Sequence, residues 1–95
     1  MKGNILVVDD EEQLRRLLFR LLSLEGFTVH EVATLKAAGQ KLNEHPTDVV
    51  LCDVKLPDGN GVDFVSTVKK KFPSVEVILL TAFGNIPDGV RAIKN

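Results

Sequence analysis

The sequence has little of what marks secreted, membrane-spanning or nucleic-acid-binding chains. A single cysteine among 95 residues excludes an internal disulfide and fits a reducing compartment. No apolar run approaches the roughly 20 residues of a membrane-spanning helix, and the N-terminal segment turns acidic after a few apolar residues, unlike a secretory signal. A net charge of −1 provides no basic surface for nucleic acid. We therefore expect a cytoplasmic domain that makes no direct contact with nucleic acid or with a membrane.

The chain does have an ordinary globular composition and a regular alternation of patterns. Hydrophobic residues make up 44% and charged residues 26% of it, as in soluble globular proteins. Its 95 residues allow one small domain, which we expect to span residues 1–95. Short apolar runs alternate with segments of helical spacing, and the runs lie at residues 5–8, 27–32, 49–52 and 75–80. This alternation predicts βαβ units and an α/β fold with a doubly wound parallel sheet.

Helix patterns and chain breakers set the expected boundaries. The first helix has an apolar face formed by Leu14, Leu17, Leu18, Leu21 and Leu22. Gly26 is well placed to end that helix, Thr34 can cap the second, and Pro73 stops the third. The third apolar run, 49–52, predicts a strand buried on both faces, and the turn-rich segment 55–61 follows it.

Carboxylates follow two of the predicted strands at the point where each ends. Asp9 and Asp10 come directly after the first apolar run, and Asp53 after the third. In a sheet of order 2-1-3-4 the first and third strands are neighbours, so the three side chains share one corner. Clustered carboxylates need a compensating cation or proton, and Mg²⁺ is the natural partner because it binds carboxylates and phosphate oxygens together. Thr81, closing the fourth run, could donate its hydroxyl to a phosphate oxygen.

These residues carry a family resemblance that covers the whole chain. It resembles the receiver domain of bacterial two-component response regulators, which has a flavodoxin-like fold. The matching positions are Asp9-Asp10, Asp53, Pro57, Gly61 and Thr81. Residues 7–12 and 80–85 are most similar to receivers attached to sigma-54-dependent transcriptional activators.

The resemblance implies a role for each residue. Asp53 would accept a phosphoryl group from a sensor histidine kinase, which would switch an output such as transcription. Asp10 and Asp53 would bind Mg²⁺ directly, together with the backbone carbonyl of Lys55. Asp9 would hold the ion through water, and Thr81 would contact the phosphoryl group and move on activation. The domain would be a phosphoacceptor that assists its own phosphotransfer and dephosphorylation, rather than a conventional enzyme.

The resemblance also predicts what the chain is missing. The family has five strands and five helices, and at the spacing seen here the fifth strand would start beyond the last residue, Asn95. We therefore expect a chain truncated before strand 5 and helix 5, without the strand-5 lysine that binds the phosphoryl group. The fourth strand would then be an exposed apolar edge, which favours a homodimer or an element-swapped oligomer. The alternative function is that of a structural association fragment that is not phosphorylated.

Two other classes of protein fit the motifs less well. A phosphatase with an aspartyl nucleophile would need an Asp-x-Asp pattern after its first strand, but here Asp9 is followed by Asp10 and Glu11. A nucleotide-binding domain of similar fold would need a glycine-rich phosphate loop at the same place, and the sequence has none there.

Overall fold

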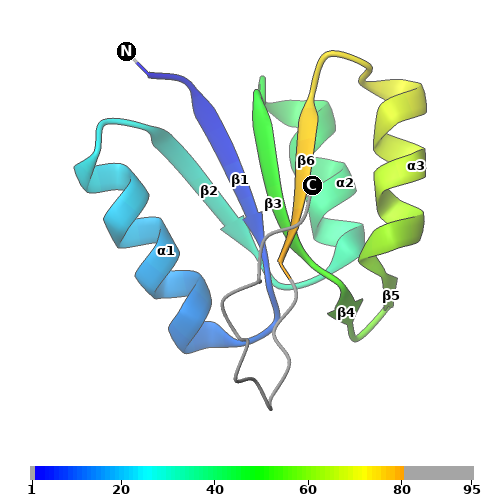
Figure 1. Cartoon of the computed structure of the whole chain (residues 1–95), viewed down its shortest axis with the longest axis horizontal. Coiled ribbons are helices and arrows are strands. Elements are labelled where there is room, and N and C mark those ends of the chain that lie inside the picture. Colours follow the sequence, from blue (N-terminus) through cyan, green and yellow to red (C-terminus); the bar gives the residue numbers. More distant parts are fainter. Residues whose placement is uncertain (1, 81–95) are drawn as a thin grey trace.

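A computed structural model describes residues 2–80 of the chain (Figure 1). The elements are β1 (Asn4–Val8), α1 (Glu12–Leu24), β2 (Thr28–Val32), α2 (Leu35–Glu44), β3 (Val49–Asp53), β4 (Lys55–Leu56), β5 (Gly59–Asn60), α3 (Gly61–Lys71) and β6 (Glu76–Leu80). Each of the four predicted strands and three predicted helices within this range is present. Thr81 lies outside the described residues, as does segment 86–95, whose sequence, with Pro87 near its beginning, predicts the start of a fourth helix.

The main sheet is parallel, with the order β2-β1-β3-β6. This confirms the predicted order 2-1-3-4, because β6 is the fourth strand of the sequence pattern. Two strands of two residues each, β4 and β5, form a separate antiparallel hairpin within the predicted turn 55–61. In the register between β1 and β3, Val8 lies opposite Cys52. The residues that follow them, Asp9 and Asp53, therefore reach the carboxyl edge of the sheet at the same level.

Helices cover both faces of this sheet, but unequally (Figure 1). On one face, α2 and α3 enclose a cluster of buried residues: Leu6, Val8, Val32, Ala38, Leu42, Val50, Cys52, Leu56, Val68 and Val75. On the other face, α1 packs over the smaller cluster of Ile5, Val7 and Val29, to which Leu18, Phe19 and Leu22 contribute. The larger cluster is closed by two helices and the smaller by one, within the range that the structure describes.

This asymmetry changes one expectation about β3. Val50 and Cys52 are fully buried, whereas Val49 and Leu51 are only partly buried. In the part of the chain that the structure describes, β3 is therefore fully buried on one face only, and the prediction of a strand buried on both faces was wrong. The reason is that Val49 and Leu51 belong to the face that α1 covers alone. On α1 itself, Leu17 and Leu21 of the predicted apolar face are 51% and 50% exposed.

The helix ends follow local hydrogen-bonding rules. Thr34 caps α2, since its hydroxyl oxygen accepts the Ala37 N–H at 3.1 Å, as predicted. Gly26 has a φ of 103° and follows α1 with the bonding pattern of a glycine-terminated helix. The side-chain oxygen of Asn60 accepts the Val62 N–H at 2.6 Å and so caps the N-terminus of α3.

A second cap of α2 comes from a distant part of the chain. The carboxylate of Asp58, in the β4–β5 hairpin, accepts the N–H groups of Leu35 at 2.9 Å and Lys36 at 3.0 Å. These two bonds favour the ionised form and lower the pKa of Asp58. The hairpin that follows β3 is thereby attached to the N-terminal end of α2.

We expect Asp58→Asn to lower the thermal stability of the chain at neutral pH. An amide has one acceptor oxygen where the carboxylate has two, and it lacks the charge that suits a helix N-terminus. Because the pKa of Asp58 in the folded chain is below its ordinary value of 3.8, its contribution is complete above that value and is lost as the pH falls further. Thermal unfolding followed by circular dichroism should therefore separate the two proteins at neutral pH and bring them together well below 3.8. Identical unfolding at neutral pH would contradict this role.

Candidate functional site

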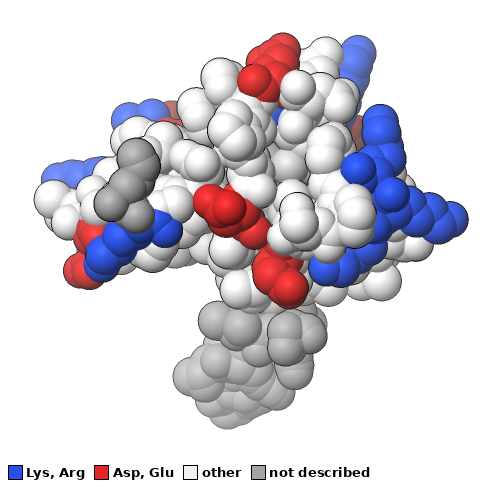
Figure 2. Space-filling view, turned by 90° about the horizontal axis from the view of Figure 1, so that it is seen from above, with Lys and Arg blue, Asp and Glu red and all other residues white. Residues whose placement is uncertain are grey.

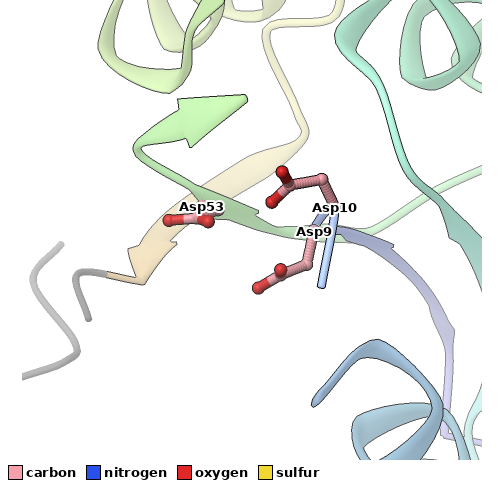
Figure 3. A group of neighbouring side chains, drawn as sticks. All are labelled: Asp9, Asp10 and Asp53. Atoms are coloured by element: carbon pink, nitrogen blue, oxygen red, sulfur yellow. The ribbon is translucent and has the colours of Figure 1, made fainter. Parts of the chain in front are cut away.

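Three carboxylates meet at the carboxyl edge of the main sheet (Figure 3). Asp9 and Asp10 follow β1, and Asp53 is the last residue of β3. Each offers an oxygen, and these oxygens all lie within 4.8 Å of one another. The strand order and register predicted this convergence, because the carboxyl ends of neighbouring parallel strands meet at one edge.

The three side chains differ in their exposure to solvent. Asp9 is 2% exposed, Asp53 is partly buried and Asp10 is exposed. Burial raises the pKa of Asp9, and the negative charges of Asp53 and Asp10 raise it further. The Glu11 N–H, which donates to the Asp9 carboxylate at 2.8 Å, acts in the opposite direction. Among the described residues, Asp9 is thus a buried carboxylate with one hydrogen bond and three acidic neighbours, Asp10, Glu11 and Asp53.

Asp53 experiences the same opposition of effects. Burial raises its pKa, and the charge of Asp10 adds to that rise. The backbone N–H groups of Val54 and Lys55 stabilise the ionised form and lower the pKa. Burial and the charge of Asp10 therefore disfavour the ionised form of Asp53, and a nearby cation would favour it.

The donor set fits a hard divalent cation. The ion pairs found within residues 2–80 do not include any of the three aspartates, so their charge is not neutralised by a lysine or arginine there. All the available donors are oxygens, which Mg²⁺ prefers, and it typically uses one or two carboxylates while keeping several waters. Of the other predicted site residues, Lys55 begins β4 two positions after Asp53, and Thr81 lies outside the described residues.

The backbone beside Asp53 is fixed by Gly61, whose role the sequence did not reveal. The Gly61 N–H donates to the Val54 carbonyl oxygen at 2.7 Å. A Cβ at position 61 would overlap the Asp53 carbonyl oxygen and would lie 3.2 Å from the Val54 Cα. Only glycine permits this approach, so the start of α3 is packed directly against the chain that carries Asp53.

A group of basic side chains lies at the end of α3, away from the carboxyl edge of the main sheet. Figure 2 shows them on one side of the molecule, over α3, whose last turn contains Lys69, Lys70 and Lys71. Acidic side chains lie between them and the basic side chains on the opposite side of the same view. The face in Figure 2 therefore has no continuous basic surface.

The chain belongs to the response regulator receiver domain family, whose model matches residues 5–95. This confirms the family predicted from the aspartates. Response regulator protein PilR of Pseudomonas aeruginosa is 34% identical over 89 residues, covering 94% of the chain and 20% of PilR. The photosynthetic apparatus regulatory protein RegA of Rhodovulum sulfidophilum is 33% identical, covering 96% of the chain and 50% of RegA. The chain thus spans a fifth to a half of the length of these relatives.

Solved structures support the same conclusion. The response regulator TrrA of Thermotoga maritima, solved in complex with Mg²⁺-BeF, has a TM-score of 0.80 and 33% identity over 86% of the chain and 71% of TrrA. The beryllofluoride-activated NtrC4 receiver domain dimer has a TM-score of 0.80 and 37% identity over 94% of the chain and 74% of that receiver. The similarity to receivers of sigma-54-dependent activators is also confirmed, with PilR and the DNA-binding transcriptional regulator NtrC of Proteus hauseri among the relatives. Within residues 2–80, no helix is long and apolar enough to span a membrane.

Proposed function

We propose that Asp53 accepts a phosphoryl group from a sensor histidine kinase and that the resulting charge switches an output, most naturally transcription. The observation that carries this proposal is the meeting of Asp9, Asp10 and Asp53 at one strand edge, without a neutralising side chain among residues 2–80, in a receiver-family chain. The full-length protein would act in the cytoplasm, with this domain contacting the kinase but neither nucleic acid nor membrane directly.

The residues would divide the chemistry between them. A carboxylate oxygen of Asp53 forms a bond to phosphorus while the bond from phosphorus to the kinase imidazole nitrogen breaks, leaving an acyl phosphate and a neutral imidazole after proton uptake. Asp10, Asp53 and the Lys55 carbonyl would bind Mg²⁺ directly, and Asp9 would do so through water. The ion would offset the negative charge on the transferring group. Thr81 would donate its hydroxyl to a phosphoryl oxygen.

The direct test is intact mass after incubation of the full chain with acetyl phosphate, with and without Mg²⁺. We expect one phosphoryl adduct that requires Mg²⁺ and that peptide mapping places on the segment containing Asp53. An adduct on another segment, or one that forms equally without the ion, would contradict the assignment. No adduct at all would favour the alternative, a structural association domain.

We also propose that the chain associates through the edge of β6. This strand pairs with β3 on one side, and its residues Val77, Ile78, Leu79 and Leu80 are only partly buried within the described range. An apolar strand with an open edge is a template for pairing with a second chain. A homodimer or element-swapped oligomer would cover it, and a monomer by light scattering across a wide concentration range would contradict this.

A further inference from the structure

Asp9 is held by hydrogen bonds at each of its backbone polar groups and at its carboxylate. Its N–H donates to the Val32 carbonyl at 3.1 Å, and its carboxylate accepts the Glu11 N–H at 2.8 Å. Its carbonyl oxygen accepts from Nη1 of Arg15 at 3.0 Å. That carbonyl shares a rigid peptide plane with the N–H of Asp10. The Arg15 guanidinium therefore fixes the peptide that joins two of the three aspartates.

Arg15 is itself held in place by Glu31 at the end of β2. Its Nε donates to Glu31 Oε1 at 2.9 Å, and the two side chains are only 17% and 14% exposed. Glu31 accepts a second bond from Nη1 of Arg16 at 2.9 Å, but the Arg16 side chain is 59% exposed. Arg15 thus bridges β2 to the end of β1, whereas the exposed Arg16 bonds to Glu31 without reaching Asp9.

Asp10 depends on this arrangement more than Asp9 does. No hydrogen bond among residues 2–80 holds the exposed Asp10 carboxylate. Its direction toward Asp9 and Asp53 is therefore set by its own backbone, which begins at the peptide that Arg15 fixes (Figure 3).

We propose that Arg15 is a positioning residue for the magnesium site: anchored by Glu31, it fixes the Asp9 carbonyl and so directs the Asp10 carboxylate toward the ion. The proposal rests on the proposed function, since it concerns the same site. Arg15 acts as a donor rather than as a charge, because Glu31 pairs with its guanidinium. A role through charge would have the opposite sign, since removing a cation beside a cation site strengthens Mg²⁺ binding.

The test is Mg²⁺ affinity by isothermal titration calorimetry on the full chain and on Arg15→Gln, Arg15→Lys and Arg16→Gln. We expect both Arg15 variants to bind Mg²⁺ roughly tenfold more weakly, as for other groups that orient a metal ligand. Lysine keeps the charge, but its single ammonium nitrogen cannot replace the two guanidinium nitrogens that bond Glu31 and the Asp9 carbonyl. Arg16→Gln is the matched control because it removes the same charge from the same glutamate without touching Asp9, and its affinity should equal or slightly exceed that of the unmodified chain.

Two further readouts separate positioning from general loss of structure. In metal-free NMR spectra, the Asp10 amide nitrogen should shift in Arg15→Lys and Glu31→Gln, while the amides of α2 and α3 keep their positions. Labelling by acetyl phosphate should need more Mg²⁺ in these variants but should recover its full extent at saturating Mg²⁺. If Arg15→Gln does not fold, Arg15→Lys and Glu31→Gln carry the same test.

The possible outcomes distinguish this inference from the proposed function. Arg15 variants that bind Mg²⁺ as tightly as the unmodified chain would overturn the inference alone, provided that Asp10→Asn still weakens binding. Equal strengthening in Arg15→Gln and Arg16→Gln would also overturn it, in favour of a charge effect. An unmodified chain that binds no Mg²⁺, with Asp10→Asn unchanged from it, would overturn the proposed function and the inference with it.

Discussion

Asp53→Asn is expected to abolish the phosphoryl adduct and, at the same time, to make the metal-free chain more stable. The amide is not a nucleophile toward phosphorus at neutral pH, so labelling should fall to background. Its neutrality also removes one of three charges whose oxygens lie within 4.8 Å of one another. Unit charges this close repel by about 1 kcal/mol even in water, so relief of that repulsion should raise the free energy of unfolding by a similar amount, which corresponds to roughly 4–8 °C in Tm for a domain of this size.

Asp63→Asn is the matched control for this substitution. Asp63 is an exposed residue in the first turn of α3 and is not part of the carboxylate cluster. Its replacement should leave labelling intact and should lower stability slightly through the lost charge at a helix N-terminus. Adding Mg²⁺ should raise the Tm of the unmodified chain more than that of Asp53→Asn, because a bound ligand stabilises the state that binds it. Persistent labelling of Asp53→Asn would move the nucleophile to another residue.

Asp53→Asn is expected to lose labelling but to gain stability, because the charges that the site needs for its function destabilise the metal-free fold. Burial raises the pKa of both Asp9 and Asp53, which means that the fold tolerates their charges rather than favouring them. A carboxylate cluster that destabilises the metal-free fold is also one in which a bound cation stabilises the fold the most. This is the reason that carboxylates at a strand edge are more informative about function than the same residues scattered over a surface.

The meeting of these aspartates could be predicted because it depends on topology alone. Once the alternating pattern predicts a parallel sheet with the first and third strands adjacent, Asp9 and Asp53 must emerge at one edge, whatever the details of packing. The register, in which Val8 lies opposite Cys52, then brings them to the same level. Predictions of this kind need only the order of strands and the positions at which they end.

The contacts of Arg15 could not be predicted in the same way. Helical spacing places Arg15 and Arg16 side by side on the polar side of α1, and the sequence does not show which of them faces β2. Only the packing angle of α1 on the sheet decides that Arg15, rather than Arg16, reaches the Asp9 carbonyl. Glu31 gave no signal either, because it is 16 residues away on the next strand.

The hairpin after β3 was missed for a different reason. Strands of two residues carry no periodicity, so β4 and β5 cannot be distinguished from the turn in which they lie. The cap that Asp58 provides to α2 depends on that hairpin, and it joins residues 22 and 23 positions apart. The sequence predicted the local cap of Thr34 because the bond spans three residues, but it could not predict a cap from another element.

Gly61→Ala and Gly39→Ala are expected to change stability in opposite directions, although each adds the same methyl group. A Cβ at position 61 would overlap the Asp53 carbonyl oxygen, so either α3 or the backbone of Asp53 must move. Overpacking of this kind costs about 1–3 kcal/mol, which lowers the Tm by roughly 10 °C for a domain of this size. At Gly39, inside α2, a Cβ meets nothing within 4 Å, and alanine in place of a helical glycine should stabilise the chain by roughly 0.5–1 kcal/mol.

Gly61→Ala and Gly39→Ala also test whether Mg²⁺ binding and labelling depend on the close approach of Gly61 to the backbone of Asp53. Displacement at Gly61 moves the same backbone that carries Asp53 and leads into Lys55, so Gly61→Ala should bind Mg²⁺ more weakly and be labelled less at temperatures where it remains folded. Gly39→Ala should bind Mg²⁺ and accept the phosphoryl group as the unmodified chain does, because a Cβ at position 39 meets nothing within 4 Å and so displaces neither α2 nor the loop. Thermal unfolding and calorimetry on both variants supply the measurement. A Gly61→Ala chain with unchanged Tm and Mg²⁺ affinity would show that the loop can yield at this point, and that the position of Asp53 is set by β3 alone.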